Sequence, residues 1–187
     1  MTHYPSLPED ARLEALFRRF PRGVAPLIAL HDQILRDDTS PLSLAERELI
    51  AAFVSGLNAC DFCFGAHKLM AQAFGVEEAL IDQLVADEQT AGIEPKLKPL
   101  FAYLRVLTLS PAKVTAKHTQ AVFDAGWSEE ALNDAALICA LFNFMNRVLD
   151  GAGIEPKPIF ANPSPEDIAA RRDGTYTEWA RSAKLIE

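Results

Sequence analysis

The chain has 187 residues and a formal net charge of −8, and hydrophobic residues make up 49% of it. This length and composition are typical of one globular domain with a substantial core, and they exclude disordered and collagen-like chains. The negative balance and the scattered Lys and Arg residues argue against a nucleic-acid partner, because phosphate binding needs clustered basic residues.

No apolar stretch approaches the length of a membrane span, and the first ten residues lack the basic and apolar regions of a signal peptide. We therefore expect a cytoplasmic protein without a membrane partner. In a reducing compartment three cysteines do not form a structural disulfide framework, so a close pair indicates catalysis or metal binding. Cys139 lies in an apolar run, where we expect it to pack as a small buried hydrophobe.

Helical periodicity and helix-boundary signals follow one another along the chain. Ser43 and Glu46 have the spacing of a capping box, and Gly75 and Gly126 are typical of helix ends. No alternating β-branched run between turn residues indicates a strand, so the predicted fold class is all-α. The expected helices cover residues 9–20, 24–35, 43–57, 60–74, 77–86, 95–109, 115–125 and 128–150, and a last one begins at 164–165.

The helices are expected to form one domain with an appended segment. Residues 1–155 are predicted to be a single helical domain. Residues 156–187 are predicted to be a Pro-rich arm and a C-terminal helix that pack on this domain or on a neighbouring subunit. Residues 43–75 and 110–153 both hold a helix, a connection and a second helix, which is weak evidence for an internal duplication.

Cys60, Cys63 and His67 carry most of the chemistry in this sequence. Their spacing of i, i+3 and i+7 places two thiols and an imidazole on one face of a helix. Both cysteines fall in the first turn, where unpaired N–H groups favour a thiolate, and His67 can accept a thiol proton. Glu48 can orient His67 if its helix folds back along the helix of the cysteines.

Three other interpretations of the cysteine face remain open at this point. The stripe could be ordinary core, because a free Cys packs as a small hydrophobe. It could bind zinc, although the fourth ligand would have to be His31, His118 or Cys139, none at a diagnostic spacing. A thioredoxin-type site is a poor match, because that motif follows a strand in a βαβ unit. Glu48 could also be a solvated surface residue.

The motif resembles the core of the alkylhydroperoxidase D-like proteins, part of the carboxymuconolactone decarboxylase superfamily. The resemblance rests on Glu48, eleven intervening residues and then Cys60-x-x-Cys63-x-x-x-His67, and it covers roughly residues 20–155. The run Phe-Asn-Phe-Met-Asn-Arg at 142–147 is similar to the peroxidase-related branch. Within this run, Asn146 and Arg147 are candidates for a supporting or interface role.

The resemblance implies an all-α fold, a homo-oligomer (a trimer, hexamer or dimer) and a dithiol–disulfide cycle that needs no cofactor or metal. Cys63 matches the thiol that attacks a small hydroperoxide, and Cys60 matches the thiol that resolves the sulfenic acid as a disulfide. His67 and Glu48 match the proton relay. A dithiol donor such as a lipoyl protein would reduce the disulfide, and the enzyme could also serve a peroxiredoxin.

The sequence departs from the better-studied peroxidases at Phe62, where those proteins carry a second histidine. The site is therefore expected to be more apolar, while dithiol–disulfide exchange needs only two sulfurs and one base. We predict a thiol-dependent peroxidase or disulfide reductase, an oxidoreductase that acts on peroxide. The alternatives are a non-catalytic redox-sensing or binding protein and a zinc-stabilised helical protein.

Overall fold

The computed structural model describes residues 2–187 as an assembly of helices, with no strand in that range; Met1 lies outside the described residues. The all-α prediction is confirmed. The ten α-helices are α1 (Leu13–Arg19), α2 (Val24–Leu35), α3 (Leu44–Leu57), α4 (Asp61–Ala73), α5 (Glu78–Ala86), α6 (Leu97–Leu109), α7 (Ala116–Asp124), α8 (Glu129–Ala152), α9 (Pro165–Ala169) and α10 (Tyr176–Ser182). Two 3₁₀ turns, η1 (Pro111–Lys113) and η2 (Pro158–Phe160), lie in the connections.

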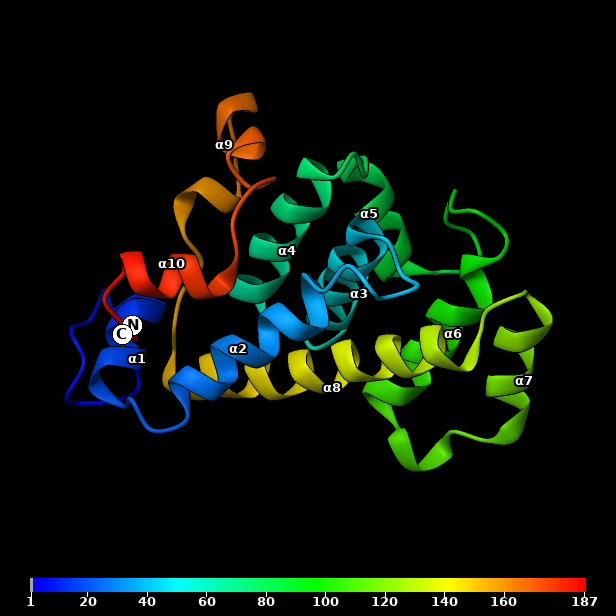
Figure 1. Ribbon diagram of the computed structural model, residues 1–187, viewed down its shortest axis with the longest axis horizontal. Helices are drawn as coiled ribbons and strands as arrows, with labels where there is room; N and C mark the ends of the chain where they lie inside the picture. The colour runs from blue at the N-terminus through cyan, green and yellow to red at the C-terminus, as the bar shows by residue number, and fades with distance from the viewer. Residues whose placement is uncertain (1) are drawn as a thin grey trace.

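Helices α3 and α8 form the centre of the molecule. Nine consecutive residues of α3, from Arg47 to Ser55, are buried, and the 24-residue helix α8 packs against α3. Figure 1 shows α2 lying along α8, with α6 and α7 at one end and α1, α10 and both chain termini at the other. The antiparallel pair α3 and α4 covers the middle, and it is this pair that carries the cysteine motif.

Local signals in the sequence account for most helix boundaries. The Ser43 hydroxyl accepts the Glu46 N–H, and the Glu46 carboxylate accepts the Ser43 N–H, so the predicted capping box is confirmed. Gly153 ends α8 in the left-handed region, at φ +68°. The helix predicted from residue 9 begins only at Leu13, because Arg12 is extended at the N-cap and residues 8–11 form a turn.

The C-terminal segment contains two short helices, where we predicted one. Helix α9 packs on α4, and α10 packs on α2, so residues 156–187 lie on the helices of their own chain. The backbone N–H groups of Tyr176 and Thr177 donate to the Asp32 carboxylate at 2.6 and 2.9 Å, and this pair of bonds fixes the start of α10 on α2. The predicted domain boundary at residue 155 and the internal duplication stay predictions.

By length and composition alone, α8 is the one helix in residues 2–187 long and apolar enough to cross a membrane, which we did not expect. Half of its most apolar stretch is buried against other helices. A core helix passes the same test, so this is weak evidence for a membrane span.

Candidate active site

The corner between α3 and α4 places the two cysteines. Three residues, Asn58, Ala59 and Cys60, make the whole connection, and Cys60 is also the N-cap residue of α4. Ala59 has a φ of +54°, in the left-handed region that non-glycine residues rarely adopt. The Cys60 N–H donates to the Ser55 carbonyl at 3.0 Å, which ties the start of α4 back onto the last turn of α3. Cys63 follows in the first turn of α4.

The two thiols are reduced, buried and in contact with one another. Cys60 is 0% exposed and Cys63 is 3% exposed, and both are free cysteines. We expected the helix terminus and His67 to lower the pKa of Cys63, but the structure gives the opposite direction. The hydrogen bond with Cys60 and burial of the sulfur raise the pKa of Cys63 well above its usual value, and a hydrogen bond with Asn146 only partly opposes them.

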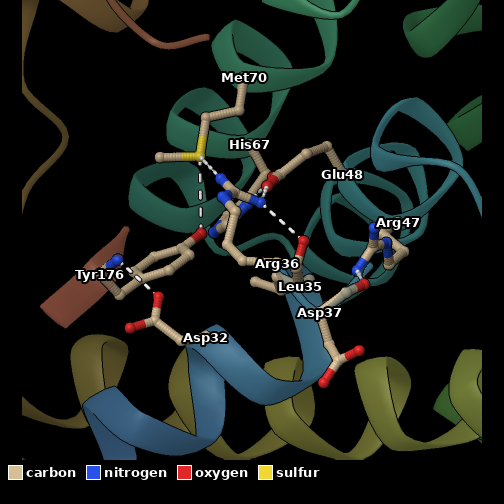
Figure 2. Close-up of polar contacts among 9 residues, drawn as sticks. All are labelled: Asp32, Leu35, Arg36, Asp37, Arg47, Glu48, His67, Met70 and Tyr176. Carbon is tan, nitrogen blue, oxygen red and sulfur yellow. Dashed lines mark hydrogen bonds and ion pairs between the residues drawn. The ribbon is translucent and has the colours of Figure 1, made fainter. Parts of the chain in front are cut away.

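Glu48 and His67 lie together, as the relay requires. The His67 Nδ1 atom is 2.6 Å from Glu48 Oε2, and Glu48 is fully buried. Figure 2 shows a third member that the motif does not contain, the Arg36 guanidinium, whose Nη1 donates to Glu48 Oε1 at 2.5 Å. Arg36 also donates to the Leu35 carbonyl and to the Met70 sulfur. The interpretation of Glu48 as a solvated surface residue is therefore wrong.

The two partners keep Glu48 ionised in the protein interior. Burial alone would raise the pKa of Glu48, but the charges and hydrogen bonds of His67 and Arg36 outweigh it, and the net pKa is lowered. Because an ionised carboxylate can only accept, Nδ1 of His67 carries the hydrogen of the bond to Glu48, and Nε2 is the ring nitrogen left to exchange a proton.

Buried amides support the thiols from α8. Asn146 Nδ2 donates to the Ser55 hydroxyl at 3.0 Å, and Asn146 Oδ1 accepts from Asn58 Nδ2 at 2.8 Å. Together with its bond to Cys63, this network joins the α3–α4 corner to α8. Arg147 is exposed and donates to the backbone and side-chain oxygens of Asn143.

A cavity of about 500 Å³ opens beside Cys63 and His67. Its walls are mainly apolar side chains of α1, α2, α4, α8, η2 and α10. Phe62 belongs to this wall: it is 6% exposed and meets Phe160 edge to face, with ring centroids 5.5 Å apart. Phe62 thus makes the site apolar, as predicted, and also holds the C-terminal arm against α4. This size and lining are typical of small-molecule sites.

Cys139 lies away from this cavity. Cys139 is 1% exposed and packs beside Thr108 and Asn143, and burial raises its pKa, so its expected place in the core is confirmed. Within residues 2–187, no three His, Cys, Asp or Glu side chains come together as a possible metal site.

Residues 24–105 match the model of the carboxymuconolactone decarboxylase family, and this stretch includes the whole cysteine motif and Glu48. The chain contains a carboxymuconolactone decarboxylase family domain. The match runs from α2 into α6, so Arg36 also lies in the family domain, whereas α8 and the C-terminal segment lie beyond the matched residues. No curated protein sequence matches the chain.

Solved structures share the fold of this family domain and its surroundings. A peroxidase-related protein from Ralstonia eutropha JMP134, described as an alkylhydroperoxidase AhpD core, superposes with a TM-score of 0.72 at 24% identity, covering 78% of this chain and 76% of that chain. A peroxidase-related protein from Silicibacter sp. TM1040 gives 0.73 at 21% identity, covering 80% and 78%. The debrominase Bmp8, in complex with 2,3,4-tribromopyrrole, gives 0.67 at 18% identity, covering 78% and 76%. The fold is therefore AhpD-like.

Arg36 and Tyr176 escaped sequence reasoning, and His31 was considered only as a zinc ligand and not as part of this cavity. Arg36 follows α2 and His31 lies in it, while Tyr176 comes from α10, far along the chain. None of the three belongs to the sequence motif that contains the cysteines. The capping box at Thr175 and Glu178 was the one local signal that α10 exists.

Proposed function

We propose that the protein is a thiol-dependent peroxidase that cycles Cys60 and Cys63 between dithiol and disulfide. The observation that supports this best is the convergence of two contacting thiols, a histidine oriented by a buried carboxylate, and a cavity that reaches both Cys63 and His67. The AhpD-like fold of peroxidase-related proteins agrees with it.

In the first step His67 Nε2 takes the Cys63 proton while Glu48 holds the ring from Nδ1. The Cys63 thiolate attacks the terminal oxygen of a hydroperoxide: the S–O bond forms, the O–O bond breaks, and the leaving alkoxide takes a proton to become an alcohol. Because the pKa of Cys63 is raised, the resting thiol is protonated and depends on this transfer.

In the second step the Cys60 sulfur attacks the Cys63 sulfenic acid, which releases water and forms the disulfide. A dithiol donor then reduces the disulfide by thiol–disulfide exchange. One hydroperoxide and one dithiol donor thus yield one alcohol, one water and one oxidised donor. A lipoyl-bearing protein is our proposed donor, a peroxiredoxin a further proposed partner, and the working form a cytoplasmic homo-oligomer.

The test is reduction of cumene hydroperoxide by the purified protein with dihydrolipoamide as the donor. We expect turnover by the wild type and by Cys139→Ser, and no turnover by Cys63→Ser. Cys60→Ser should react once and stop, leaving a Cys63 sulfenic acid that dimedone labels. Mass spectrometry should find a Cys60–Cys63 disulfide in the wild type after one equivalent of peroxide.

Two results would contradict the proposal in different ways. Peroxide loss no faster than in the Cys63→Ser control would exclude the peroxidase. Stoichiometric disulfide formation without turnover would favour the redox-sensing alternative, in which the Cys60–Cys63 bond reports oxidation.

A further inference from the structure

His31 lies in the wall of the same cavity, although nothing in the peroxidase cycle uses it. It comes from the inner face of α2, and its side chain is nearly buried, at 5% exposed. The Phe142 ring contacts both imidazoles edge to face, with its centroid 6.2 Å from that of His31 and 4.3 Å from that of His67. The Tyr176 ring lies 5.0 Å away from the His31 ring. Two imidazoles therefore flank one apolar pocket.

The hydrogen bonding of His31 fixes where its proton lies. Nδ1 is 2.8 Å from the Leu27 carbonyl oxygen, and a carbonyl can only accept, so Nδ1 carries a hydrogen and donates it. Burial lowers the pKa of His31 to about 4, which keeps the ring neutral at neutral pH. A neutral ring with its proton on Nδ1 has a free lone pair on Nε2.

Nothing in the described chain satisfies that lone pair. The bond to Leu27 is the one hydrogen bond that the His31 side chain makes within residues 2–187. The nearest ring with a donor, that of Tyr176, sends its hydroxyl to the Met70 sulfur at 3.6 Å. Nε2 is not among the fully buried unpaired side-chain atoms of residues 2–187, so it is open to the cavity. A ligand that fills the cavity leaves this acceptor unpaired, at a cost in free energy, unless it brings an O–H or N–H group.

We propose that His31 Nε2 is the hydrogen-bond acceptor of a ligand subsite in this cavity, which takes small, largely apolar organic molecules that carry a hydroxyl or hydroperoxyl O–H. The apolar walls from Phe17, Ile28 and Met145 cover the body of such a ligand. The subsite lies in the proposed peroxidase pocket and rests on that function for its biological meaning, but its binding is tested without turnover.

The test compares two unreactive probes that differ by one donor: 2-phenylpropan-2-ol and its methyl ether. Isothermal titration of the reduced wild-type protein should show the alcohol binding about five- to tenfold more tightly than the ether, which is the ratio expected for one hydrogen bond. His31→Phe keeps an aromatic ring against Phe142 but has no acceptor, so the preference for the alcohol should disappear. His3→Phe, at an exposed histidine, is the matched control and should keep it.

A measurement on the unsubstituted protein covers the case in which His31→Phe does not fold. The ¹⁵N resonance of His31 Nε2 should move when the alcohol is added and stay in place with the ether, while Nδ1 is unaffected by either. Equal affinity for the two probes, binding of neither, or a preference that survives in His31→Phe would each overturn the subsite.

The two proposals fail separately. A protein that reduces peroxide without the His31-dependent preference contradicts the subsite alone, and a protein that shows the preference without peroxide reduction contradicts the peroxidase alone.

Discussion

The reactivity of Cys63 depends on neighbours that act in opposite directions. The Cys60 hydrogen bond and burial disfavour the thiolate, whereas Asn146 favours it. We expected the helix N-terminus and His67 to lower the pKa of Cys63. In the reduced state the contact with Cys60 and burial outweigh them. A buried protonated dithiol resists adventitious oxidation, and its activation depends on the relay from His67 to Glu48 and Arg36.

The largest of these influences is open to a direct test, substitution of Cys60 by Ala. The Cys60→Ala variant loses the hydrogen bond that raises the pKa of Cys63, so that pKa should fall and alkylation of Cys63 should reach its half-maximal rate at a lower pH than in the wild type. The measurement is the rate of iodoacetamide labelling at Cys63 from pH 6 to 10, followed by peptide mass spectrometry. Cys139→Ala, which removes another buried cysteine, should leave the profile unchanged. An unchanged or higher midpoint in Cys60→Ala would contradict the role assigned to Cys60.

At the scale of the helices, sequence reasoning succeeded where the cause of a structure is local. The capping box at Ser43 and the length of α2 follow from residues within a turn or two of each boundary, and both agree with the structure. The contact of Glu48 with His67 was also within reach, because a connection of three residues makes α3 and α4 run antiparallel. The raised pKa of Cys63 was not predictable, because it depends on the hydrogen bond with Cys60 and on the burial of the sulfur in the fold, which together outweigh the opposing bond from Asn146 of α8.

The backbone strain at Ala59, in the connection between α3 and α4, can be tested by substitution. Ala59 holds a left-handed backbone conformation that costs an L-residue about 1 kcal/mol and costs glycine almost nothing. Ala59 is exposed, so Ala59→Gly loses no packing and should raise the free energy of unfolding by about 0.5 kcal/mol, after the entropy that glycine adds to the unfolded chain.

Ala125 is the matched control, because it also joins two helices but has a right-handed φ of −78°. Ala125→Gly should lower the free energy of unfolding by about 0.5–1 kcal/mol. Urea denaturation of both variants measures the difference, and a loss of stability at both positions would show that Ala59 is not strained.

At the scale of the whole molecule, the candidate site is assembled from three distant parts of the chain. The family domain supplies the thiols, His67, Glu48 and Arg36; α8 supplies Phe142 and Asn146; and the C-terminal segment closes the cavity with Tyr176. Figure 1 shows α10 lying over the end of α2, near the chain termini. No sequence pattern links residue 176 to residue 31, so this part of the site had to come from the fold.

The attachment of α10 therefore decides whether the cavity is closed. A helix of seven residues is marginal by itself, and the Asp32 carboxylate holds the first two N–H groups of α10. Asp32→Ala removes both bonds and should lower the free energy of unfolding by about 1–2 kcal/mol. Because the lost bonds join α10 to α2, the damage should be local: limited trypsin digestion should cleave at Arg171 and Arg172 faster than in the wild type.

Asp38→Ala, at an exposed carboxylate just after α2, is the control. Equal digestion rates in the two variants would mean that the apolar contacts of Trp179 and its neighbours hold α10 without Asp32.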